Sequence, residues 1–235
     1  ETFVGSSGRV FPKSLKASPL LRAWLRRLAE LGVQPRLRHR WTGWRGDALV
    51  FDAPDGSFET VHDAAILAMG GASWAKLGSD GAWSGIVEQA GVATAPFKPA
   101  NCSFEVDWRE HVGAKFAGTP MKSMALSFGD RTVRGEAMVS ETGIEGGAVY
   151  ALSPDLRDAI DATGSARLII DLKPDNDVSR LAARLEGGRQ GDTVTSRLRK
   201  VGLPPVSIAV LREGVRPLPQ DPFALAEAIK AVPIM

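Results

Sequence analysis

The stretch AAILAMGGASWAKLGSDGAW, Ala64 to Trp83, decides the fold of the first part of the chain. Its first half is an apolar run that ends in two glycines, which predicts a strand buried on both faces, as in a covered parallel sheet. A loop with a second glycine cluster follows, and the pattern predicts a helix from about Gly81 to Ala90, ended by Gly91. A strand, a glycine loop and a helix in this order are typical of the ligand-binding edge of an α/β sheet.

Two features of this stretch bear on a ligand. Gly70 and Gly71 lack a Cβ, so a ligand could approach their backbone closely. The free N–H groups at the start of the following helix could bind an anion. Asp80 argues against a simple phosphate site, because its carboxylate would occupy those N–H groups; it caps the helix or accepts hydrogen bonds from a ribose or a flavin ring. The alternative is a tight strand–loop–helix turn that binds nothing.

A second candidate loop is GSSGRVFPKSLKAS, Gly5 to Ser18, which precedes the first expected helix. Arg9 would supply paired donors to a polar or anionic ligand, and Phe11-Pro12 would form a rigid apolar wall. The first 45 residues hold ten Lys and Arg against two acidic residues, which would attract an anionic cofactor or nucleic acid. The alternatives are an exposed N-terminal loop and a solvated basic helix face.

The bulk composition excludes several classes of protein. The chain has 235 residues, 44% hydrophobic and 24% charged, which is ordinary for a soluble globular protein. No apolar run is long enough to span a membrane, so we expect no membrane partner. The single cysteine, Cys102, excludes an internal disulfide, is expected to be buried and inert, and fits a cytoplasmic setting. The histidines His39, His62 and His111 are too far apart for metal-ligand spacing.

The texture of the sequence changes after TAPFKPA, Thr94 to Ala100, and predicts two modules. Residues 1–95 contain a helix with an apolar stripe, which starts at Ser18-Pro19, an antiparallel meander with a hairpin turn at APDG, and the stretch quoted above. Residues 96–174 show short strand candidates at regular intervals, which predicts a small β-barrel. Residues 175–235 show helical patterns ended by Gly or Pro.

Several segments together carry a resemblance to a known family. FVGSSGRVFPKSLKASPLLRAWLRRL, HRWTGW, ILAMGGASWAKLGSDGAW and SETGIEGGAVYALS resemble a bacterial family of NAD(P)/FAD-dependent flavoproteins, described as aminoacetone-oxidase-like or BaiN-type. The resemblance implies an α/β fold with an insert: a Rossmann-like FAD-binding domain over 1–95, interrupted by an inserted β-barrel and helical domain over 96–235. It implies flavin-mediated hydride or electron transfer to or from an unknown small organic substrate.

The resemblance also implies which residues would contact FAD. The AMGG segment would pass near the ADP part, the GSDG segment would form the following loop, and the GRVFP segment would lie toward the flavin ring. The implied cofactor-binding residues are Ala68, Met69, Gly70 and Gly71; Gly78, Ser79, Asp80 and Gly81; and Gly8, Arg9, Phe11 and Pro12. SETGIEGGAV, Ser140 to Val149, would lie at the junction of insert and FAD domain and line substrate access, unless it is a plain strand-to-helix turn.

The sequence departs from the family at both ends. The G-x-G-x-x-G segment and the C-terminal glycine-rich segment of the family are absent, and both are needed to hold the FAD pyrophosphate. We therefore expect an internal fragment of a longer flavoprotein that binds FAD weakly or not at all alone. The parent would be the enzyme, with NAD(P)H as a candidate electron donor and a small molecule as substrate.

The competing hypothesis is a binding module without chemistry. A small barrel with nearby basic residues could contact RNA or another protein. Aromatic residues are not interleaved with Lys and Arg on the barrel strands, which argues against nucleic acid. A scaffold domain is the third alternative, and nothing in the sequence indicates the substrate or the oligomeric state.

Overall fold

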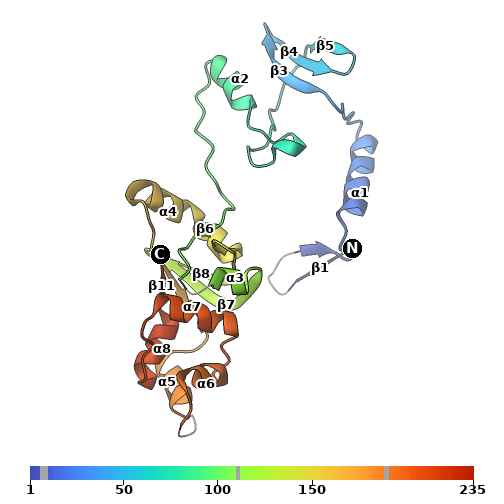
Figure 1. Cartoon of the computed structure of the whole chain (residues 1–235). Helices are drawn as coiled ribbons and strands as arrows, with labels where there is room; N and C mark the ends of the chain where they lie inside the picture. The colour runs from blue at the N-terminus through green and yellow to red at the C-terminus, as the bar shows by residue number, and fades with distance from the viewer. Residues whose placement is uncertain (6–9, 110–111, 188–190) are drawn as a thin grey trace. The chain divides into compact units, whose positions relative to one another are not determined.

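The computed structural model describes residues 1–5, 10–109, 112–187 and 191–235 (Figure 1). The chain forms two compact units, Glu1–Lys98 and Pro99–Met235, and each is described here by itself. The division falls three residues beyond the boundary at 95/96 that the sequence indicates. In the described residues of both units, no helix is long and apolar enough to cross a bilayer.

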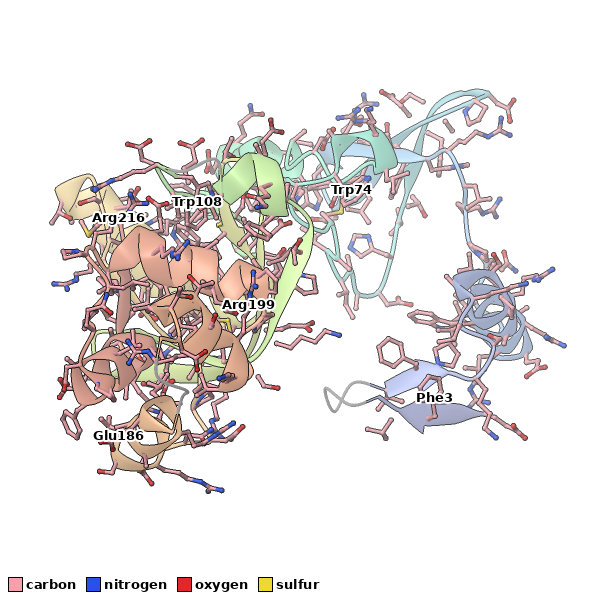
Figure 2. The ribbon with its side chains drawn as sticks, turned by 60° about the horizontal axis from the view of Figure 1, so that its bottom comes forward. Phe3, Trp74, Trp108, Glu186, Arg199 and Arg216 are labelled. Carbon is pink, nitrogen blue, oxygen red and sulfur yellow. The ribbon has the colours of Figure 1, made fainter. Side chains whose placement is uncertain are left out.

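Unit 1 begins with a small hairpin and a helix. Strands β1 (Thr2–Val4) and β2 (Val10–Pro12) pair antiparallel, and the Phe3 ring, labelled in Figure 2, stacks on Phe11 with centroids 5.7 Å apart. Helix α1 (Ala17–Glu30) starts one residue before the predicted Ser18 cap. Most of its large apolar side chains are exposed, namely Leu20, Leu21, Trp24 and Leu25.

The predicted meander of unit 1 is present. Strands β3 (Arg40–Arg45), β4 (Ala48–Ala53) and β5 (Gly56–Thr60) form a three-stranded antiparallel sheet in chain order. The chain reverses between β4 and β5 at the APDG turn, where Gly56 takes a positive φ of 116°. Trp41 is buried and meets Trp44 edge to face, so one face of the meander holds the local core.

The predicted buried strand in AAILAMGG is wrong for this structure. Residues 64–71 form no ladder with any described residue, and Ile66 and Leu67 are 92% and 43% exposed. A strand needs a neighbour to accept and donate its backbone hydrogen bonds, and the described residues supply none for this segment. The helix predicted from Gly81 to Ala90 is present: a 3₁₀ turn (Ala75–Leu77) leads to helix α2 (Trp83–Gln89). The helix ends just before Gly91, whose φ is 85°.

Unit 2 is built on one six-stranded antiparallel sheet. Its order is β11-β10-β7-β8-β9-β6, so β6 and β11 are the two edges. A bulge in β7, between Met121 and Met124, places Ser123 at φ 53° and curls the longest pair of strands. The bounds are β6 Phe104–Glu105, β7 Thr119–Phe128, β8 Arg131–Val139, β9 Gly143–Glu145, β10 Leu168–Asp171 and β11 Val232–Ile234.

Helices cover this sheet and complete the core of unit 2. Helix α4 (Gly147–Thr163) follows β9 and buries Val149, Leu152 and Leu156 against β7 and β8. Helices α5 to α8 gather at the other end of the unit in Figure 1 and bury leucines such as Leu181 and Leu225. Their bounds, with the short helix α3, are α3 Val112–Phe116, α5 Val178–Glu186, α6 Val194–Lys200, α7 Pro205–Gly214 and α8 Pro222–Lys230.

The helical pattern at the end of the chain holds up to Lys230 and then fails. Asp177 and Asp221 cap α5 and α8, each accepting a backbone N–H with its carboxylate. Residues Val232–Ile234 are not helical; they form β11, which pairs with β10. The segment predicted to be helical over 175–235 therefore ends in a strand of the six-stranded sheet of unit 2.

A lysine at the base of the helical cluster gives a prediction about pH. Lys173 donates to the Gly202 carbonyl at 2.9 Å, and burial, followed by the nearby Arg184 charge, lowers the pKa of its ammonium group. Because the folded pKa lies below the unfolded value of 10.5, wild-type stability should rise as pH passes from that lowered pKa toward 10.5. Urea unfolding from pH 8 upward should show this rise relative to Lys173→Met, and parallel curves would contradict it.

Candidate functional site

In unit 1 the glycine segment borders a cavity of about 580 Å³. Three predicted residues line it, Met69, Gly78 and Asp80, and the opposite wall comes from the start of β3 and from α2. The wall residues are Arg38, His39, Arg40, Trp41, Leu77, Ala82, Trp83 and Ile86. Cationic side chains at and just before β3 and residues of the glycine loop therefore line the same cavity.

Asp80 is held by two partners within this cavity wall. Its Oδ1 accepts the Ala82 backbone N–H at 3.1 Å, at the start of α2, and its Oδ2 accepts from the Arg40 guanidinium at 3.2 Å. The predicted helix cap is not formed, because α2 has Ala82 at its N-cap with no side-chain cap bond; Asp80 instead closes a turn just before the helix and forms an ion pair with a residue 40 positions earlier. A carboxylate in this place disfavours a phosphate at the α2 N-terminus, and its remaining lone pairs suit hydroxyl donors such as those of a ribose.

The glycines of the segment divide into two kinds. Gly70, Gly78 and Gly81 have positive φ, and a Cβ would lie 2.8 Å from Ser79 Oγ at Gly70 and 2.8 Å from the Ala72 Cβ at Gly81. Packing within unit 1 therefore explains why Gly70 and Gly81 carry no side chain. At Gly71 and Gly78 no atom of a described residue comes within 4 Å of a Cβ position. Of the four, Gly71 and Gly78 leave room for close approach by another molecule.

The other members of the predicted set lie around this cavity or apart from it. Ala68 is exposed, and Ser79 is half-buried and pairs with Trp74, labelled in Figure 2, through two backbone hydrogen bonds of 3.1 Å. Phe11 and Pro12 belong to the β1–β2 hairpin and are absent from the described lining of the cavity. Gly8 and Arg9 lie outside the described residues, so the structure describes only Val10, Phe11 and Pro12 of the GRVFP segment.

Unit 2 contains the other segment singled out by the sequence, Ser140 to Val149. The Ser140 N–H donates to Gly143 O at 2.8 Å, and the Val106 N–H donates to Thr142 O at 2.9 Å, which closes a tight turn against β6 and the residue that follows it. A Cβ on Gly143 would overlap the Phe104 carbonyl, and one on Gly146 would lie 3.0 Å from Ala137 Cα. The turn is packed against backbone and leads directly into α4.

Two buried polar atoms near this turn have no hydrogen-bond partner among the described residues. They are the Ser140 Oγ and the Nε1 of Trp108, a residue labelled in Figure 2. The Trp108 ring lies beside the turn, because a Cβ on Gly113 would be 3.0 Å from Trp108 Cδ1 and would overlap the Glu141 carbonyl. Buried polar atoms are normally paired, so this turn is a place where a further polar group is expected.

Sequence reasoning missed the residues that fix these features. The Trp83 indole donates to Gly70 O at 3.1 Å and ties α2 to the glycine loop, and Arg40 neutralises Asp80. The prediction that Cys102 is buried was also wrong: its side chain is half-buried and lines a cavity of unit 2. The one signal in the sequence was Trp83, which follows Gly81 of the loop by two residues. The Arg40–Asp80 contact joins residues far apart in the sequence and gave no such signal. Among the described residues no metal-ligand cluster forms.

Comparison with known proteins decides the family. Residues 98–234 match the family described as "HI0933-like protein barrel and H2TH domain", and they make up more than half of the chain. The chain belongs to the HI0933-like family. The match covers unit 2, in which the curled sheet corresponds to the barrel and the α5–α8 cluster supplies the helical part. The expected resemblance to a flavoprotein family is supported at this family level.

One curated relative extends the comparison beyond unit 2. The chain is 26% identical over 184 residues to a 3-dehydro-bile acid delta(4,6)-reductase from Clostridium scindens. The aligned part is 74% of this chain and 43% of the relative, so the chain spans less than half the length of that protein. This HI0933-like chain is therefore similar to part of a reductase.

Proposed function

We propose that this chain is part of a FAD-dependent oxidoreductase of the aminoacetone-oxidase-like or BaiN type that acts on a small organic substrate. The family match and the similarity to a reductase support an oxidoreductase. Bound FAD would supply the hydride or electron transfer, with NAD(P)H as the proposed electron donor. The chain's own residues would bind and orient the cofactor and shape the substrate space.

The observation that carries this proposal is the open main chain at Gly71. At Gly70 a side chain would collide with Ser79, which explains the glycine there. At Gly71 no atom of a described residue comes within 4 Å of a Cβ position, so protein packing does not explain the glycine. Close approach by a nucleotide would explain it. In this proposal Ala68–Gly71 pass the ADP part of FAD and Gly78–Gly81 border it, with the ribose rather than the pyrophosphate beside Asp80.

Unit 1 and unit 2 would then have different roles. Arg38 in the wall of the unit 1 cavity would attract the anionic cofactor, while Gly8, Arg9, Phe11 and Pro12 would lie toward the flavin ring. The turn at Ser140–Gly146 would line the substrate space. The unpaired Ser140 Oγ and Trp108 Nε1 support this role, because each could bond a polar group of substrate or cofactor.

Flavin content of a Gly71 variant tests the proposal. In the intact protein, Gly71→Val should reduce bound FAD by at least about tenfold, because the branched side chain fills the space that the nucleotide needs. Gly85→Val is the control, since Gly85 also has no neighbour within 4 Å of its Cβ position and lies outside the proposed contact. FAD released from each purified variant is measured by chromatography, with circular dichroism to verify folding. If folded Gly71→Val protein bound as much FAD as the wild type, the proposal would be wrong.

A further inference from the structure

We propose that unit 2 carries a binding site for an uncharged, largely apolar small molecule with one hydrogen-bond acceptor. The site is a cavity of about 420 Å³ formed where the two edges of the six-stranded sheet and helix α4 come together. All of its residues lie between Pro99 and Met235. The inference goes beyond the flavin proposal, because it needs no residue of unit 1 and no dinucleotide.

The two sheet edges explain why a cavity exists here. Strand β6 pairs only with β9 and strand β11 only with β10 among the described residues, so the curled sheet does not close on itself. Phe104 of β6 and Ile234 of β11 both line the cavity. The open side of a curled sheet is a recurrent place for ligands, and this volume lies in the usual range of about 300–1,000 Å³ for small-molecule sites.

The lining is mainly aliphatic. Helix α4 contributes Leu156 and Ile160, the central strands contribute Ile144 and Leu168, and the 104–106 segment adds Phe104 and Val106. Ile160 is only half-buried, so its side chain presents apolar surface to the cavity. Ile144, Leu156 and Leu168 are already buried in the core, so Phe104, Val106 and Ile160, all half-buried, supply the apolar surface that a ligand would cover.

The charged groups in the wall exclude an anionic ligand. The Arg157 guanidinium donates to Pro99 O at 2.7 Å and pairs with the Asp158 carboxylate at 3.2 Å, so its charge is already balanced. Glu105 and Asp161, both acidic, also line the cavity. Arg157 has five N–H donors and its side chain is 19% exposed, which leaves donors for a carbonyl or hydroxyl oxygen of a neutral ligand.

The neutral fluorophore N-phenyl-1-naphthylamine is a suitable probe. On titration into the full chain, its emission should rise and saturate at one molecule per chain. Ile160→Trp, which places an indole in the cavity, should weaken binding by at least about tenfold. Ala162→Trp is the matched control: Ala162 is exposed on the same helix, lies outside the lining, and its variant should bind within about twofold of wild type. Equal affinity of both variants, or no saturable binding to wild type, would overturn the proposal.

A second measurement needs no variant and excludes binding to the exposed apolar face of α1. Cys102 is the one cysteine of the chain and lines the cavity, so N-ethylmaleimide reports on this place alone. Saturating probe should slow alkylation of Cys102 severalfold, as followed by mass spectrometry. An unchanged alkylation rate at saturating probe would mean that the probe sits elsewhere and would refute the site. Neither readout involves flavin, so failure here leaves the flavin proposal to its own test.

Discussion

Gly143→Ala should destabilise unit 2 by more than about 4 kcal/mol or prevent it from folding. The added Cβ would overlap the Phe104 carbonyl oxygen and lie 2.8 Å from its carbon, and both are backbone atoms that cannot rotate away. Relief requires β6 and β9 to separate, although their pairing holds one edge of the sheet. Urea unfolding followed by circular dichroism measures the loss.

Gly187→Ala is the matched control for this substitution. Gly187 ends α5, and a Cβ there would meet its nearest atoms, two backbone oxygens, at 3.6 and 3.8 Å, which is ordinary contact. Its variant should stay within about 0.5 kcal/mol of wild type. If Gly143→Ala unfolded at the same urea concentration as Gly187→Ala, the packing described for the Ser140–Gly146 turn would be wrong.

Lys230→Met should cost about 2 kcal/mol of unfolding free energy, the second large effect. Lys230 Nζ pairs with Asp171 Oδ2 at 2.6 Å and donates to Lys173 O at 3.1 Å, which joins the end of α8 to the end of β10. The two side chains are 19% and 21% exposed, so removing the ammonium leaves a poorly solvated carboxylate. Chemical unfolding at neutral pH gives the value.

An exposed ion pair of unit 2 provides the comparison. Arg134 pairs with Asp175 at 2.8 Å, but their side chains are 61% and 69% exposed. Water screens such a pair, so Arg134→Met should cost less than about 0.5 kcal/mol. Comparable losses from the two substitutions would show that burial does not set the strength of the Lys230–Asp171 pair.

Local chemistry was enough to predict many elements of this fold. The APDG turn specified the β4–β5 hairpin, because its glycine supplies the positive φ that the reversal uses. The helices of residues 175–235 follow from their helical patterns, which end at Gly or Pro, whereas the Asp177 cap of α5 is seen only in the structure. The apolar run at 64–71 failed as a strand because its formation depends on neighbouring strands, which the run itself does not encode.

The candidate sites were harder to predict, since they depend on distant residues meeting. The sequence marked Asp80 as a cap, whereas in the structure it closes a turn just before α2 and pairs with Arg40. The glycines looked alike in sequence, yet Gly81 is packed against protein atoms and Gly71 is open. The cavity of unit 2 joins residues near 104, 160 and 234, and no local pattern indicates that the sheet ends there.

The outermost strands of the unit 2 sheet bear on how the protein behaves when it is concentrated. Strand β6 has two residues and β11 has three, and the middle residue of β11 is Pro233, which has no N–H to offer. An intruding strand from another copy would find few backbone groups to pair with at either side. The domain should therefore resist edge-to-edge polymerisation at high protein concentration.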